Sequence, residues 1–177
     1  MARSTNTTEE GAIPVTGRKT LRTLSGLGLA TAILIASGCA TGGGQSVSEL
    51  HLFGVPVALN LDPTPGPDGI GVRVYASDAG GTEGIVIRQG TLEVLLYDGI
   101  VSSTSARTTP PLKIWSFSPA ALKAYSGKTS LGSGYQFALK WAPEIPRQPA
   151  VTVIARYRAP GGAVLWSTAN TVSVTAK

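Results

Sequence analysis

Alternation of apolar and polar residues with a period of two constrains the fold of this chain more than any other feature. Successive side chains of a β-strand point to opposite faces, so such a run predicts a strand with one buried face. The two clearest runs cover residues 135–141 and 151–158. The residues expected to point inward are Tyr135, Phe137, Leu139 and Trp141, followed by Val151, Val153, Ala155 and Tyr157. The turn Ala159-Pro160-Gly161-Gly162 then predicts an antiparallel hairpin between residues 151–158 and 163–167.

Shorter runs extend this pattern through the rest of the domain. Further strands are predicted over residues 55–61, 70–76, 85–88, 91–98 and 170–176. Pro56 would make the first of these an edge or bulged strand, because proline has no backbone donor. Residues 102–111 are predicted to be an exposed loop, and Pro119–Tyr125 a short helix with Ser118 as its N-cap and Gly127 as its terminator. The pattern indicates an all-β fold, an antiparallel β-sandwich of seven or eight strands with one short helix, and a small barrel is the alternative.

The N-terminal segment predicts where this domain is held. Arg18, Lys19 and Arg22 precede an apolar run, and Ala36-Ser37-Gly38 then leads to Cys39, the single cysteine of the chain. The run has about 13 residues, the length of a signal-peptide core, whereas a membrane span needs about 20. The arrangement resembles the lipobox of bacterial lipoproteins. The resemblance implies that residues 1–38 are a signal peptide and that Cys39 is acylated; simple secretion and an uncleaved anchor are the alternatives.

The segment after the cysteine predicts a tether. Residues 39–49 are rich in glycine and serine, which favours a flexible linker, so the folded domain is expected over 50–177. Of 15 Lys and Arg and 10 Asp and Glu, four basic and two acidic residues lie in 1–38, which leaves a net charge of +3. These charges are scattered singly and do not indicate nucleic-acid binding. The expected location is the bacterial cell envelope, with the lipid on Cys39 in the outer membrane and the domain facing the periplasm.

Few residues of the chain can support catalysis. A serine nucleophile normally needs a histidine base, and the single histidine, His51, lies next to the predicted tether. We therefore expect no catalysis, no cofactor and no metal. Asp62 and Asp68 flank a proline-rich loop, where turn formation explains them, although carboxylates on loops can also bind calcium or a small ligand. A hydrolase that uses an unrecognised pair of carboxylates is a further alternative.

Two tryptophans are candidates for ligand binding. Trp115 lies beside a predicted loop and Trp166 precedes a polar stretch, so both could be exposed. Exposed aromatic rings can stack on sugars, but large aromatic side chains also dominate cores. Together with Asp62 and Asp68, these tryptophans form the predicted binding residues of a small-ligand or glycan-binding protein.

Three strand-like segments resemble a known family. Residues Ala58-Leu59-Asn60-Leu61-Asp62, Val72-Arg73-Val74-Tyr75 and Val153-Ile154-Ala155-Arg156-Tyr157-Arg158 are similar to strands of the outer-membrane lipoprotein of type VI secretion systems. The chain resembles uncharacterised bacterial lipoproteins with such sandwiches equally well. The resemblance implies an immunoglobulin- or transthyretin-like β-sandwich that binds an envelope protein, and it assigns no site residue. The favoured function is therefore a lipid-anchored binding or scaffolding module.

The run 151–158 also predicts how two substitutions differ. Val153 is on the inward face, so Val153→Asp would bury an unpaired carboxylate and abolish folding. Arg156 is on the other face and is expected in solvent, where Arg156→Ala would change stability by under about 0.5 kcal/mol. Ile154 shares that face and indicates that part of it is covered.

We predict that Cys39→Ser moves the protein from the membrane fraction to the soluble fraction, or leaves an unprocessed precursor. The lipid attaches through the thiol, and the apolar run alone is too short to span a bilayer stably. Fractionation and incorporation of labelled palmitate measure the change. Equal palmitate incorporation in both proteins would contradict lipidation at Cys39.

Overall fold

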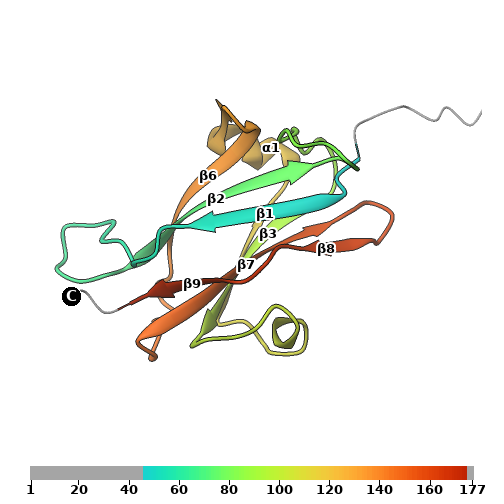
Figure 1. Ribbon diagram of the computed structural model, residues 1–177. Helices are drawn as coiled ribbons and strands as arrows, with labels where there is room; N and C mark the ends of the chain where they lie inside the picture. Colours follow the sequence, from blue (N-terminus) through green and yellow to red (C-terminus); the bar gives the residue numbers. More distant parts are fainter. Residues whose placement is uncertain (1–45, 175–177) are drawn as a thin grey trace, which may run out of the picture. The chain divides into compact units, whose positions relative to one another are not determined.

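The computed structural model describes residues 46–174, which fold as a sandwich of two antiparallel β-sheets (Figure 1). In the first sheet the order is β1-β2-β6-β5, formed by Glu49–Gly54, Gly69–Ser77, Gly132–Lys140 and Ser126–Thr129. The second sheet has the order β4-β3-β7-β8, formed by Lys113–Phe117, Thr91–Asp98, Ala150–Arg158 and Val164–Trp166. Strand β9 (Asn170–Ser173) also pairs with β7. The predicted all-β sandwich is confirmed, with nine strands in the described range and two separate sheets rather than one closed barrel.

The main core lies between the two sheets. The inward residues predicted for 135–141 and 151–157 are all buried, and Val151, Val153 and Ala155 have no exposed surface. They meet the inward side chains of the other strands, which are Leu50, Leu52, Ile70, Val72, Val74, Leu92, Val94, Leu96 and Val172. The Tyr135 hydroxyl is also buried there and accepts a hydrogen bond from the Ile87 amide at 2.7 Å, which satisfies a polar group inside the core.

The predicted hairpin and helix are both present. Strands β7 and β8 pair antiparallel, with Tyr157 opposite Leu165. Helix α1 (Pro119–Leu122) continues into the 3-10 turn η2 (Lys123–Tyr125), and the Ser118 hydroxyl accepts the Ala121 amide as an N-cap. Gly127 was wrongly predicted as the helix terminator. It lies within β5 instead, because the chain turns directly from η2 into that edge strand.

The prediction for the first strand was wrong in position. Alternation starts earlier, at Glu49, with Leu50 and Leu52 buried and His51 and Phe53 exposed. The end of the predicted tether therefore belongs to β1. Residues 55–61 form only isolated bridges, in which Val57 pairs with Ser173 and Leu59 with Gly69. Residues 85–88 likewise form a bridge rather than a strand, whereas the polar or short strands β4 and β5 were not predicted.

A second, smaller core lies on the outer face of the second sheet. Leu95, Tyr97 and Ile154 are buried there beneath the 3-10 turn η1 (Ser105–Arg107), and Ala106 of that turn is only 2% exposed. The Tyr97 hydroxyl donates to the Ala106 carbonyl at 2.9 Å. Residues 102–111 are mostly exposed, as predicted, but the turn η1 within them and the buried Ala106 were not predicted.

Arg156 belongs to the same covered face and does not project into solvent. Its side chain is 13% exposed, its Nε atom lies 2.5 Å from Glu93 Oε2, and its guanidinium carbon lies 5.0 Å from the Trp166 ring centre. Arg158 also donates to Glu93, at 3.0 Å. Burial alone would raise the pKa of Glu93, but the hydrogen bonds from the two arginines outweigh it and hold this pKa below 4.5.

We therefore predict that Arg156→Ala costs about 1–3 kcal/mol of unfolding free energy, because a charged hydrogen bond to a buried carboxylate is lost. Arg88→Ala, at an exposed arginine, should cost under about 0.5 kcal/mol. Val153→Asp should still abolish folding, since Val153 is fully buried. Chemical denaturation at pH 7 measures all three, and equal effects of the two arginine variants would contradict the network.

The pH dependence of stability in the native protein and in Arg156→Ala tests the ion pairs of Glu93. Because the folded-state pKa of Glu93 is lowered, its ion pairs stabilise the fold above the ordinary value of 4.5, and this contribution is lost as the pH falls through the folded-state pKa. The difference between the unfolding free energies of the native protein and Arg156→Ala should therefore shrink below about pH 4.5.

Candidate functional site

The proline-rich loop after residue 61 is held by its own carboxylates. Asp62 and Asp68 both face Lys140, with N–O distances of 3.0 and 3.3 Å. Asp62 also accepts the Thr64 amide and Asp68 the Leu61 amide. Hydrogen bonds from the Lys140 ammonium and the Thr64 amide lower the pKa of Asp62 to about 2. The structure brings the two predicted aspartates together, and their contacts stabilise the loop itself.

The two candidate tryptophans lie on opposite faces of the second sheet. Trp115 of β4 is opposite Val94, whose side chain belongs to the core between the sheets. Trp166 of β8 is opposite Arg156, which is paired with Glu93 on the outer face. Both rings are partly buried against apolar neighbours. They do not form one platform, and neither lies on the sheet that contains Lys140.

The remaining candidates offer little chemistry in the part of the chain that is described. Cys39 lies outside the described residues. His51 is half exposed on β1, with Nε2 3.5 Å from a Glu49 carboxylate oxygen. Within residues 46–174, no three His, Cys, Asp or Glu side chains gather as a metal site would require. None of the helices in this range has the length and apolar character needed to cross a membrane.

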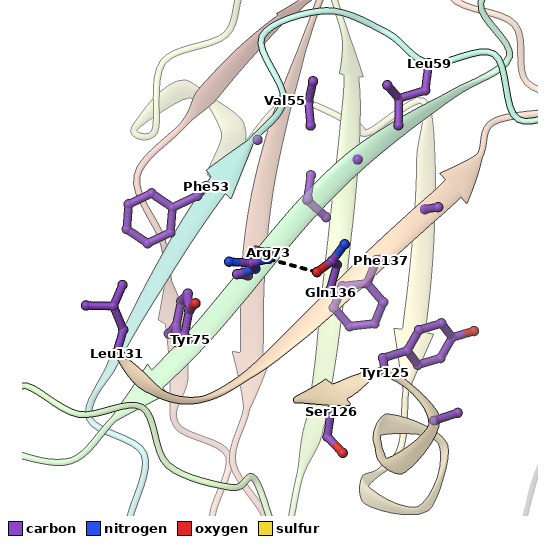
Figure 2. A pocket seen from close by; sticks show the side chains of 15 residues that line it. Phe53, Val55, Leu59, Arg73, Tyr75, Tyr125, Ser126, Leu131, Gln136 and Phe137 are labelled. Atoms are coloured by element: carbon purple, nitrogen blue, oxygen red, sulfur yellow. Dashed lines mark hydrogen bonds between the residues drawn. The ribbon is translucent and has the colours of Figure 1, made fainter. Parts of the chain in front are cut away.

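A groove of about 680 Å³ lies on the outer face of the first sheet (Figure 2). Its floor is made by outward residues of β2 and β6, which are Gly71, Arg73, Gln136 and Ala138. Figure 2 shows the Arg73–Gln136 pair in the middle, with Phe53, Tyr75 and Leu131 on one side and Tyr125 on the other. This surface was not among the sites expected from the sequence.

One wall of the groove depends on a glycine. The segment after β1 continues along the same edge of β2, where Val55 donates its amide to the Gly71 carbonyl at 2.9 Å. A Cβ atom at residue 71 would lie 2.9 Å from Leu59 Cδ1 and 3.1 Å from Val55 Cγ2. The absence of a side chain at Gly71 therefore allows Val55 and Leu59 to form this wall.

A second wall depends on an aromatic ring that lies across β6. Tyr75 points outward from β2, yet it is 4% exposed, because Phe53 packs on it edge to face at 6.0 Å. The Tyr75 hydroxyl contacts the Thr129 hydroxyl at 3.1 Å. A Cβ atom at Gly134 would lie 2.6 Å from Tyr75 Cε1, so this ring position requires glycine on the neighbouring strand.

The third side is an aromatic side chain at the edge of the sheet. Tyr125 of η2 packs against Phe117 and Phe137, with ring centres 5.3 and 4.8 Å apart. It remains 37% exposed and faces the groove. The connection from β4 through α1 to β5 thus places an aromatic ring beside the floor.

The charged side chains that line the groove and the adjoining hollow are all positive. Arg73 lines the groove, and Lys128 lines the adjoining hollow along β5, whereas no Asp or Glu lines either one. Lys113, Lys140, Arg156 and Arg158 each have a carboxylate within 4.0 Å, but among the described residues neither Arg73 nor Lys128 does. The groove therefore carries uncompensated positive charge.

Comparison of the chain with protein-family models, with curated proteins and with solved structures found no match. The function is therefore inferred from the groove and from the sequence signals described above.

We predict that Gly134→Ala destabilises the fold by roughly 1–3 kcal/mol, because the new methyl group overlaps the Tyr75 ring. Gly127 lies directly opposite on β5, and no atom lies within 4 Å of the position its Cβ would take. Gly127→Ala should therefore be neutral or stabilise by up to about 1 kcal/mol. Thermal melts and tyrosine absorbance of the two variants measure this, and equal melts would contradict the glycine requirement.

Proposed function

We propose that this protein is a lipid-anchored, non-catalytic binding module of a bacterial cell envelope, and that it binds a protein partner in the groove of the first sheet. The observation that carries the proposal is a ring of large apolar side chains around a central arginine. Phe53, Val55, Tyr125 and Leu131 are 55%, 40%, 37% and 52% exposed and border the groove. Exposed apolar patches mark interaction sites, and aromatic residues with arginine are enriched in protein interfaces.

The chemistry of the lining favours binding over catalysis. No His, Cys, Asp or Glu lines the groove, so these walls supply no conventional base or nucleophile beyond hydroxyl groups. The walls instead offer apolar contact area and hydrogen-bond donors. These are the properties of a recognition surface.

The predicted anchor restricts where the partner can be. About ten residues separate Cys39 from the start of β1, and an extended chain of that length spans at most roughly 35 Å. An acylated Cys39 would therefore keep the groove close to the membrane surface. The expected partner is an envelope protein at the same membrane.

The proposal is tested by photo-crosslinking in intact cells. Leu131 is replaced by p-benzoylphenylalanine, with Ile145 replaced in the same way as the control, because Ile145 is 68% exposed but does not line the groove. We expect a discrete crosslinked product from position 131 and none from position 145. Phe53→Asp should abolish that product, while a thermal melt still shows one cooperative transition, because Phe53 is 55% exposed although it packs on Tyr75.

A second control tests whether a new carboxylate outside the groove also weakens binding. Ile100 is 80% exposed and also lies outside the groove, so Ile100→Asp should leave the product from position 131 intact. Identical products from positions 131 and 145, or a product unaffected by Phe53→Asp, would overturn the groove as the binding surface.

A further inference from the structure

We propose that the groove recognises a carboxylate, and that its occupant is an extended acidic segment of the partner protein. In this proposal Arg73, oriented by Gln136, binds an Asp or Glu side chain, and apolar residues on either side of it in the partner lie on the groove walls. The inference rests on the proposed function and names the chemistry of its partner.

The strand register places Arg73 at the centre of a row across three strands. Phe53 of β1 is directly opposite Arg73 of β2, and Arg73 is directly opposite Gln136 of β6. Directly opposed residues of antiparallel strands have Cβ atoms about 5 Å apart. An exposed aromatic ring, a guanidinium group and an amide therefore stand side by side on one sheet face.

The Arg73 side chain is oriented by one hydrogen bond and keeps further hydrogen-bond donors available. Its Nη2 donates to Gln136 Oε1 at 2.8 Å, which is the one hydrogen bond that its side chain makes with the described residues. A guanidinium group has five N–H donors in a planar fork, so most of them face solvent. The bond also fixes the orientation of the Gln136 amide, because its oxygen accepts and its NH2 group remains a donor. The pair presents several donors and no charged acceptor.

A carboxylate is the group that this arrangement fits. A planar fork matches a carboxylate with two parallel hydrogen bonds. The surrounding Phe53, Val55, Tyr125 and Leu131 would exclude water when a partner binds, and a charge pair is stronger in such a low-dielectric setting. Lys128 in the adjoining hollow adds a second positive charge of longer range.

The apolar walls indicate a peptide rather than a free anion. A small anion would contact Arg73 alone and would leave the walls on either side uncovered (Figure 2). In an extended chain, residues i and i+2 point to the same side and lie about 7 Å apart. We therefore expect an acidic residue with large apolar residues two positions before and after it.

The test uses the full-length protein in detergent, immobilised and panned against a phage-displayed random peptide library. We expect enriched peptides with Asp or Glu flanked by apolar residues. Each enriched peptide is then synthesised in matched forms that differ only by Asp→Asn or Glu→Gln, and fluorescence polarisation measures Kd. The neutral form should bind at least tenfold more weakly, and the preference should fall as salt is raised.

Three variants of the protein locate the effect. Arg73→Gln removes the charge, whereas Gln136→Glu keeps the arginine but gives it an internal carboxylate partner. Both should raise the Kd of the acidic peptide at least tenfold with an unchanged melting temperature. Arg88→Gln removes an exposed arginine that does not line the groove, and should leave the Kd unchanged.

The outcomes separate this inference from the proposed function. A crosslink from position 131 that persists in Arg73→Gln, or enriched peptides that bind equally well after Asp→Asn, would overturn carboxylate recognition and leave the groove as an interface. Absence of both the crosslink and any enriched peptide would overturn both proposals. Arg73-dependent binding to phosphatidylglycerol vesicles, without peptide enrichment, would replace the peptide with an anionic membrane surface.

Discussion

Apolar contact between the inward faces of the two sheets holds the sandwich together and sets which residues point outward. Strands β2 and β6 of one sheet and β3 and β7 of the other bury their alternate side chains against each other, and many of these residues have no exposed surface. Because the side-chain period of a strand is two, burial of one set of residues directs the other set outward. The position of Arg73 outside the sandwich therefore follows from the burial of Val72 and Val74 inside it.

The outer faces of the two sheets differ in how far other segments cover them. On the second sheet, η1 covers Tyr97 and Ile154, and Glu93 is neutralised by two arginines. On the first sheet the segment after β1 and the turn η2 cover only the margins, and the middle remains open as the groove. An uncovered face with apolar margins and an unpaired cation is the asymmetry from which the binding function is inferred.

The pattern of alternation predicted the strands correctly where it is long and apolar. The inward faces of β6 and β7, the hairpin to β8 and the capped helix α1 were all predicted. It failed where a strand is short or polar, as in β4 and β5, and where alternation had two possible starting points, as near β1. The prediction that Arg156 projects into solvent was also wrong, because its burial depends on Glu93 of β3 and on the Trp166 ring, which alternation within one strand does not show.

The candidate site illustrates the same limit. The alternation of Arg73 and Gln136 with apolar neighbours predicts that both point outward. Their contact, however, depends on the register of β2 against β6. That register joins residues 63 positions apart in the chain and exists only once the two strands pair. The signals that could have directed attention to this face were the apolar residue Phe53, which alternates with the buried Leu50 and Leu52, and the glycines at positions 71 and 134 within strands.

The all-β class, the inward residues of the long strands and the hairpin are predictable from the chain alone, because they depend on periodicity and on local turn chemistry. The sequence also carries the signal from which lipid anchoring at Cys39 is predicted. Three features are visible only in the folded protein. The loop aspartates pair with Lys140, the two tryptophans lie apart, and Phe53, Arg73 and Gln136 form one row. These are contacts between segments distant in the chain, and their geometry arises from sheet pairing and packing, which no local pattern encodes.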